Sequence, residues 1–456
     1  MRALGCLFAM WLAVASPALA AAPEDRPQAR ETVDWLRDAV IYEVYPRSFS
    51  AAGNFNGVIP QLDRLKALGV TVIWLMPIHP IGKLKAKGPL GSPYSVRDYE
   101  AVNPEFGSPG DLRKLVNAAH ARGMKVFIDI VANHTSWDSM LIRKHPEWFK
   151  KDSAGRIVPP NPDWVDVAQL DYSHPGLRKY MNGMLVRWLR DYGIDGFRCD
   201  YAGGVPTDFW EEARREWDKV RPGLAFLAEA DDPALLESAF DIDYAWDFYH
   251  VVADAAAGKV PASEVRAVWE RAAAKYPRGA LRLRFSDNHD QLRTTAQVGL
   301  PAALAASALM FTLDGVPLLY NGMEIGDTTE SAAPALFERA PILWSMAERR
   351  PDVAPYYQAL AGLRRAHSVF TRGEVRWLAN DDANRVLSFE RHGAGNAADE
   401  SLLVAINFSS QPFAGAIQVG AGPYQDITPQ AKGSAGTPAA LSLKPWEVRV
   451  FRKAGP

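Results

Sequence analysis

Four short segments of this chain share one pattern, an apolar run that leads directly into acidic side chains. In chain order they are residues 126–134 (VFIDIVANH), 196–200 (GFRCD), 226–229 (FLAE) and 285–290 (FSDNHD). Apolar runs of this kind are typical of parallel strands that are buried on both faces. Other stretches have the apolar spacing of helices, among them residues 59–68, 109–121 and 176–192. This alternation predicts an α/β fold built around a parallel sheet.

The number and order of the strands indicate a closed barrel. Strands are predicted at residues 39–45, 70–76 and 125–131, and five more begin near Gly196, Ala225, Asp241, Leu281 and Val316. Strands that alternate with helices in this way predict a (β/α)8 TIM barrel, in which catalytic side chains lie where the strands end. The four acidic segments end at that face, so we expect their carboxylates to converge there.

Two further regions depart from the barrel pattern. Residues 135–175 contain Asp, Lys, Pro and Trp in irregular order, and so long a connection is usually functional. From residue 370 the pattern changes to short apolar strands separated by Gly, Asn and Asp, which predicts a small antiparallel β-sandwich. We therefore expect a barrel from residues 36–134 and 176–369, a short excursion domain at 135–175 and a C-terminal β-sandwich domain at 370–456.

The N-terminus has the features of a secretory signal peptide. Arg2 precedes an apolar run from Leu7 to Val14, and residues 18–20 (ALA) fit a cleavage site. The sequence thus predicts a signal peptide at residues 1–20 and a secreted or periplasmic protein. The apolar run is short for a membrane anchor, and no later segment predicts a membrane span. The formal net charge of −2 argues against a role on nucleic acids or membrane surfaces.

Converging carboxylates without a dense cluster of metal ligands are typical of glycosidic bond chemistry. The four segments resemble, in order and in spacing, the four signature regions of glycoside hydrolase family 13, the α-amylase family. The resemblance runs from about Asp38 to Phe451. It implies a (β/α)8 barrel, an excursion domain after the third strand and a β-sandwich after the barrel. It implies no organic cofactor.

The resemblance assigns roles to three carboxylates. It implies that Asp200 is the nucleophile and that Glu229 is the general acid and then the general base. Asp290 would bind sugar hydroxyls and stabilise the transition state. Retaining glycosidases hold the first two groups roughly 5 Å apart. Asp200 and Glu229 end neighbouring strands of the predicted barrel, so they can meet this distance.

The residues before the predicted nucleophile alternate between the two faces of their strand. Arg198 lies two positions before Asp200 and therefore faces the same side. A guanidinium there keeps the carboxylate ionised and oriented. Cys199 faces the opposite side, and we expect it to lie in the core. Asp129, in the first acidic segment, is expected to support the site through hydrogen bonds.

Three more residues are expected to contact substrate. His134 and His289 each follow an Asn near a strand end, and His289 also precedes Asp290. Both offer hydrogen-bond donors for sugar hydroxyls. Tyr94, within residues 91–96 (GSPYSV), resembles the family's aromatic platform under the cleaved sugar. With Arg198, these residues are the predicted substrate-binding set.

Calcium is the candidate metal that the resemblance implies. Many α-amylases hold Ca²⁺ between the barrel and the excursion domain, and Asn133, Asp163 and Asp166 are the corresponding candidate ligands here. Calcium takes about 6–8 oxygen ligands. Asp200, however, is followed by Tyr-Ala-Gly-Gly and not by the Lys-His pair common in calcium-dependent α-amylases. That departure argues against a calcium site and against strict endo-specificity for starch.

The sequence as a whole predicts an exported retaining glycosidase that cleaves α-1,4 bonds in starch-derived glucans or maltooligosaccharides. Its intermediate would be a covalent glucosyl-enzyme on Asp200. One alternative is a transglycosylase, an isomerase or an α-glucosidase that acts on maltose-type disaccharides with the same carboxylates. A second alternative, from another class, is a non-catalytic glycan-binding protein on the same scaffold. Its oligomeric state stays open.

Overall fold

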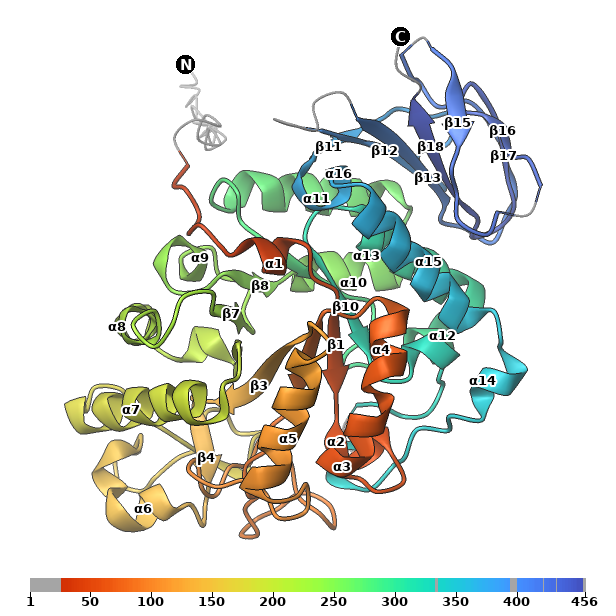
Figure 1. Cartoon of the computed structure of the whole chain (residues 1–456). Coiled ribbons are helices and arrows are strands. Elements are labelled where there is room, and N and C mark those ends of the chain that lie inside the picture. The colour runs from red at the N-terminus through yellow and green to blue at the C-terminus, as the bar shows by residue number, and fades with distance from the viewer. Residues whose placement is uncertain (1–25, 333–334, 394–399, 421, 432, 454–456) are drawn as a thin grey trace, which may run out of the picture.

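The computed structural model describes residues 26–332, 335–393, 400–420, 422–431 and 433–453. The predicted signal peptide at residues 1–20 lies outside these ranges. Within them, eight parallel strands close into a barrel in the order β1-β10-β9-β8-β7-β6-β3-β2 (Figure 1). They are β1 (Ile41–Val44), β2 (Val72–Leu75), β3 (Lys125–Val131), β6 (Gly196–Asp200), β7 (Ala225–Ala228), β8 (Ile242–Tyr244), β9 (Arg282–Arg284) and β10 (Val316–Tyr320). The predicted barrel is confirmed.

Helices surround the barrel strands (Figure 1). The longer ones are α5 (Pro109–His120), α7 (Pro175–Tyr192), α8 (Thr207–Trp217), α10 (Trp246–Ala256), α11 (Ser263–Lys275), α13 (Leu300–Thr312) and α15 (Val353–Ala366). The shorter ones are α1 (Asp34–Arg37), α2 (Pro46–Phe49), α3 (Phe55–Val58), α4 (Leu62–Leu68), α6 (Met140–Lys144), α9 (Leu235–Ser238), α12 (Thr294–Val298), α14 (Met346–Arg349) and α16 (Val369–Arg372). None of the helices in the described ranges is long and apolar enough to cross a membrane.

Local signals explain where these helices begin and end. A capping box opens α5, because the Ser108 hydroxyl accepts from the Asp111 amide and the Asp111 carboxylate accepts from the Ser108 amide. Pro109 follows at the first helical position, where its missing N–H costs nothing. Helix α4 ends at Gly69, whose φ of 99° lies in the left-handed region that favours glycine.

The alternation along β6 places one set of side chains inside the barrel and another outside. Arg198 points inward, where its guanidinium lies 5.2 Å from the ring centroid of Trp74. Cys199 and Phe197 pack outside the strand in the core formed with the helices, as expected for Cys199. Gly196 is inward as well, and a Cβ there would lie 1.7 Å from the Ala225 carbonyl oxygen. Only glycine therefore fits at the start of this strand.

The excursion after the third barrel strand is held to the barrel by a small sheet. Its strands are β4 (His134–Ser136) and β5 (Val167–Gln169), which pair antiparallel with His134 opposite Gln169. Helix α6 lies between them in sequence. Because only Ala132 and Asn133 separate β3 from β4, the sheet fixes the excursion beside the carboxyl end of the barrel.

The C-terminal region consists of two antiparallel sheets, ordered β11-β12-β13-β18-β15 and β14-β17-β16. Their strands are β11 (Glu374–Trp377), β12 (Val386–His392), β13 (Ser401–Asn407), β14 (Phe413–Gly415), β15 (Tyr424–Asp426), β16 (Gly436–Thr437), β17 (Ala440–Leu443) and β18 (Val448–Lys453). One apolar cluster joins side chains of both sheets, including Leu403 and Leu441. The predicted all-β domain is therefore confirmed.

Helix α13 packs the barrel against the C-terminal region (Figure 1). Most of its residues are buried, as expected for a helix that is apolar all round. A single cluster contains Leu309 of α13, Phe248 of α10 and Val404 of β13. Barrel and C-terminal sheet thus share one core.

Candidate active site

The carboxyl ends of the barrel strands open into a cleft of about 760 Å³, a size typical of ligand sites. Five of the seven predicted catalytic and substrate-binding residues line it: Tyr94, His134, Asp200, Glu229 and Asp290. The other two, Arg198 and His289, are fully buried and contact residues of this set. The structure therefore brings all seven together, although they come from distant parts of the sequence.

Arg198 is the centre of the polar contacts in the cleft. Its Nη1 lies 3.0 Å from Oδ1 of Asp200 and 3.1 Å from Oδ1 of Asp129. Its Nη2 lies 2.6 Å from Oε1 of Glu229. One buried guanidinium thus bridges the two carboxylates to which the sequence assigns the chemistry. A planar fork of donors is suited to such shared contacts.

Burial and mutual repulsion shift the titration of these carboxyl groups. Burial raises the pKa of Asp200 and that of Glu229 each to about 7, with nearby carboxylates adding to the shift and Arg198 opposing it. Burial raises the pKa of Asp129 to about 6, again against the opposing charge of Arg198. The site therefore retains a proton near neutral pH, as a general acid requires. Because the groups interact, the titration belongs to the pair and not to either residue alone.

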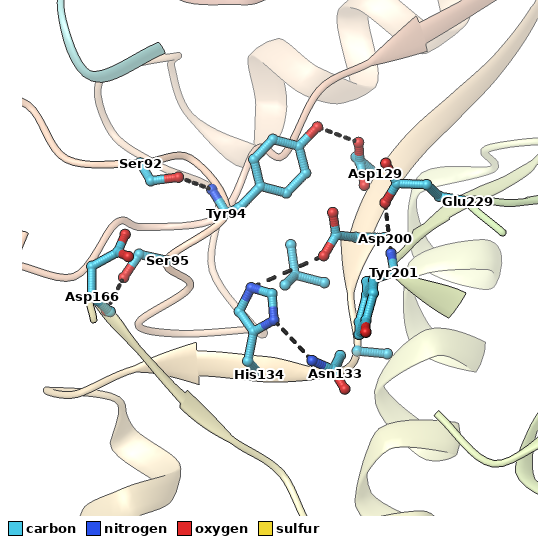
Figure 2. A network of polar contacts seen from close by, with 12 residues as sticks. Ser92, Tyr94, Ser95, Asp129, Asn133, His134, Asp166, Asp200, Tyr201 and Glu229 are labelled. Atoms are coloured by element: carbon cyan, nitrogen blue, oxygen red, sulfur yellow. Dashed lines mark hydrogen bonds and ion pairs between the residues drawn. The ribbon is translucent and has the colours of Figure 1, made fainter. Parts of the chain in front are cut away.

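Tyr94 and His289 form a stacked pair beside the carboxylates. Their ring centroids lie 5.1 Å apart with an interplanar angle of 15°. The Tyr94 hydroxyl donates to Oδ2 of Asp129 over 3.0 Å (Figure 2). Nε2 of His289 lies 2.7 Å from the Tyr94 hydroxyl and 3.2 Å from Oδ2 of Asp290. The pair therefore links Asp129, deep in the barrel, to Asp290 at the cleft.

His134 approaches the cleft from the excursion side. Its Nε2 lies 4.0 Å from Oδ2 of Asp200, and its Nδ1 lies 3.3 Å from the Asn133 side-chain amide (Figure 2). Burial lowers the pKa of His134 to about 4, so the ring is neutral at physiological pH. A neutral imidazole can donate one hydrogen bond to a sugar hydroxyl. Its position depends on the pairing of β4 with β5.

Two of the three candidate calcium ligands contact a lysine. Nζ of Lys87 lies 3.2 Å from Oδ1 of Asp166 and 3.2 Å from the backbone oxygen of Asp163. An ammonium group thus holds two of the oxygens that a cation would need. The third, Asn133, turns its side-chain amide nitrogen toward His134. Across the described ranges, no group of three or more His, Cys, Asp and Glu side chains could hold a metal ion.

Several residues of the cleft were not predicted from the sequence. Tyr201 follows the predicted nucleophile with a φ of 42°, and its amide donates to Oε2 of Glu229 over 2.7 Å. Its ring packs edge-on against Trp164, the excursion tryptophan that lines the cleft. Trp246 lines the cleft as well. The sequence left sugar stacking and loop packing both open for Trp164, whereas no local pattern distinguishes Tyr201 and Trp246 from core residues.

A buried glutamate of β1 was also missed, although the sequence contains a signal for it. Glu43 is fully buried, and its Oε1 lies 2.5 Å from Nδ1 of His289. It interrupts the otherwise apolar run of residues 39–45 at an inward position. An acidic side chain in the middle of a buried strand is rarely present without a partner. That mismatch could have marked Glu43 as a site residue.

A (β/α)8 barrel with acidic side chains at its strand ends is an architecture of glycoside hydrolases, and sequence comparison identifies the family. The model of the alpha amylase catalytic domain matches residues 43–166 and 161–386, and that of the alpha amylase C-terminal all-beta domain matches residues 377–445. The chain therefore belongs to the α-amylase family and is a glycoside hydrolase of the retaining, α-amylase type.

Two solved structures are similar over nearly the whole chain. An alpha-amylase from Lactobacillus plantarum is 33% identical, with a TM-score of 0.82, over 92% of this chain and 99% of that one. A maltogenic alpha-amylase, AmyB, from Thermotoga neapolitana is 32% identical, with a TM-score of 0.79, over 92% and 97%. Alpha-amylase MalA from Haloarcula japonica is 27% identical over 432 residues, which are 88% of this chain. The match spans only 60% of that relative's length.

Proposed function

We propose that this protein hydrolyses α-1,4-glucosidic bonds in starch-derived glucans or maltooligosaccharides with retention of configuration. Asp200 attacks the anomeric carbon while Glu229 gives its proton to the departing glycosidic oxygen. Glu229 then takes a proton from water, which attacks the glucosyl-Asp200 ester and releases the sugar and the carboxylate. Asp290 binds sugar hydroxyls and stabilises the positive charge that develops at the ring.

The observation that carries this proposal is the bridging of Asp200 and Glu229 by one guanidinium. Oxygens of the two carboxyl groups lie 3.0 Å and 2.6 Å from nitrogens of the same planar group, which is compatible with a short distance between the carboxyl groups. Close carboxylates, roughly 5 Å apart, are the geometry of retaining enzymes, whereas inverting enzymes leave room for a water molecule between them. The names of the similar amylases support an α-glucan as the substrate.

Substitution of the two carboxylates tests the assignment. We expect Asp200→Ala and Glu229→Gln each to lower kcat on maltoheptaose by about 10³-fold or more, since groups that act in the transition state mainly affect kcat. Glu237→Gln, at an exposed position of α9, is the matched control with unchanged turnover. Circular dichroism shows whether each variant is folded. Near-normal turnover of either folded carboxylate variant would remove the site assignment.

The stereochemistry of the first product tests retention directly. We expect NMR spectra recorded immediately after mixing with maltoheptaose to show the α-anomer, which mutarotates to the equilibrium mixture. Early β-anomer would contradict the glucosyl-enzyme.

Transfer of the glucosyl group to a second sugar is the alternative that one observation favours. The Tyr201 amide donates to Glu229, the proposed acid, and the residue lines the cleft with 44% of its surface exposed. With Trp164 it presents aromatic surface there, and such surfaces hold sugar rings. Products formed from maltose and from starch over time separate the possibilities. Short maltooligosaccharides from starch support hydrolysis within the polymer, whereas longer or rearranged sugars from maltose support transfer.

We also propose that the protein is exported by the signal peptide predicted at residues 1–20. The basic residue, apolar run and ALA site support the proposal. Expression of the full chain in a bacterium, followed by N-terminal sequencing of the extracellular and periplasmic fractions, tests it. A mature N-terminus at residue 21 is expected, and uncleaved protein confined to the cytoplasm would contradict export.

A further inference from the structure

Both ring nitrogens of His289 face oxygen atoms that accept hydrogen bonds. Nδ1 lies 2.5 Å from Oε1 of Glu43, and Nε2 lies 3.2 Å from Oδ2 of Asp290. The nearby hydroxyl of Tyr94 uses its own hydrogen toward Asp129, so it accepts from Nε2 over 2.7 Å. An imidazole that donates from both nitrogens carries two N–H groups and is therefore an imidazolium.

Glu43 contributes to the site through no other described contact. It is fully buried on β1, and within the described residues its Oε2 has no hydrogen-bond partner. A buried carboxylate with one unpaired oxygen is costly for stability. Among the described residues, the hydrogen bond of this carboxylate is to His289, so its charge acts on the site through that ring.

We propose that Glu43 is a positioning residue of the active site: its carboxylate, bonded to Nδ1 of His289, keeps protons on both ring nitrogens and thereby orients Tyr94 and Asp290 at the cleft. The inference rests on the proposed function, because the sugar-binding roles of those residues belong to it. No part of the sequence-based assignment includes Glu43.

The charges around the ring are consistent with this protonation state. The groups that face His289 are the carboxylates of Glu43 on β1, Asp129 on β3 and Asp290 beside it, the guanidinium of Arg198 on β6, and the Tyr94 hydroxyl. Burial alone lowers the pKa of His289 and raises that of Glu43. At the ring, the charges of Asp290 and Glu43 outweigh burial and raise the pKa of His289 to about 9, and at Glu43 the charges of His289 and Arg198 oppose the rise that burial causes. The positive ring then donates from Nε2 to the Tyr94 hydroxyl beside Asp290 and balances the negative charge around the cleft.

Glu43→Gln is the informative substitution, because glutamine keeps the shape and an acceptor oxygen but removes the charge. NMR of histidine rings in the protein without substrate, with the His289 signal identified by His289→Asn, measures the proton directly. We expect the ring to remain doubly protonated at pH 7.5 in the unmodified protein and to be neutral there in Glu43→Gln. A ring that is neutral at pH 7.5 in the unmodified protein, or one that titrates identically in the variant, would overturn the inference.

Kinetics add a measurement that a structural role would not change. For Glu43→Gln we expect kcat/KM at pH 8 to fall by about 10–100-fold, and its ratio to the unmodified value to rise toward one as the pH is lowered and the ring regains its proton. A loss that is equal at every pH would contradict the inference. Glu43→Asp, which keeps the charge, should preserve the pH profile and supplies the test if the glutamine variant does not fold.

Glu324→Gln is the matched control. This glutamate is equally buried and accepts from Tyr42 over 2.6 Å and Arg64 over 2.7 Å, and no histidine in the described part of the chain hydrogen-bonds to it. We expect it to lower stability without changing the pH profile.

The outcomes also separate the two proposals. Active Asp200→Ala protein would refute the proposed function whatever the state of His289, whereas a neutral His289 would refute only the role of Glu43.

Discussion

At the scale of single residues, Arg198 determines the charge state on which the proposed chemistry depends. It contacts the predicted nucleophile and the predicted acid at once, and it opposes the burial that raises both pKa values. Asp200 must be ionised to attack, while Glu229 must be protonated. Activity is therefore expected to fall on both sides of an optimum, with limbs that belong to the coupled pair.

Arg198→Lys should weaken this control, because an ammonium cannot reproduce the planar fork. We expect kcat to fall by about 100-fold or more. In the variant, the cation at position 198 lowers the pKa of Asp200 less, so the effect of burial raises that pKa further. The nucleophile then takes up its proton at a higher pH than in the unmodified protein. The acidic limb of kcat/KM should therefore move to higher pH. Arg190→Lys, whose side chain is 63% exposed, is the control, and an unmoved acidic limb in Arg198→Lys would contradict this role.

At the scale of elements, β6 depends on the absence of a side chain at Gly196. A Cβ there would lie 1.7 Å from the Ala225 oxygen and 2.8 Å from the Phe127 ring, and the paired strands cannot separate cheaply. We expect Gly196→Ala to destabilise the protein by about 3 kcal/mol or more in urea titrations.

The comparison is Gly183→Ala within α7, where nothing lies within 4 Å of the new Cβ. We expect it to stabilise the protein by about 0.5–1 kcal/mol, because alanine loses less backbone entropy in a helix. Equal effects of the two substitutions would contradict the close approach of β6 to β7.

The excursion is expected to be held by Lys87 and not by calcium. Asp166 is only 4% exposed, and Lys87 supplies its positive partner. Chelator should therefore leave the Tm unchanged, whereas Lys87→Met should cost about 1–2 kcal/mol by leaving a buried carboxylate unpaired. Lys83→Met, at an exposed position, is the control. A Tm lowered by chelator and restored by calcium would refute this expectation.

The sequence predicted the strands and their terminal carboxylates because both are local patterns. The apolar run and the acid of residues 196–200 are adjacent, so a single segment contains the information. Lys87 and Tyr201 could not be predicted in this way, because their partners Asp166 and Trp164 come from the irregular excursion. Loop geometry of that kind depends on tertiary packing and leaves no periodic pattern.

At the scale of the whole molecule, barrel and C-terminal sheet share a core and a set of arginine contacts. Arg391 of β12 is buried and donates to the carbonyl oxygens of Thr312 over 3.0 Å, Phe370 over 3.1 Å and Gly373 over 2.7 Å. Thr312 ends α13, the helix between the two regions. The sequence predicted both regions but not the contact between them, because no local sequence pattern shows that Arg391 donates to backbone carbonyls.

We expect calorimetry to show one unfolding transition, since neither region can lose its partner without exposing the shared cluster. Arg391→Met leaves three carbonyls without this donor, and we expect it to lower stability by about 2–4 kcal/mol and to broaden or split the transition. Arg376→Met, whose side chain is 71% exposed, is the control. Two separate transitions in the unmodified protein would contradict the shared core.

The closure of the barrel also affects the order in which activity arises during synthesis. β1 pairs with β10, so the pairing of the first barrel strand is complete only after the last one has been synthesised. Glu43 of β1 meets His289, and the amide of Tyr45 donates to Asn321, which follows β10. A ribosome delivers the chain from its N-terminus, so these contacts form only when almost the whole barrel has emerged. Translation that stops early should therefore release no fragment with the proposed activity, which would arise in one late step.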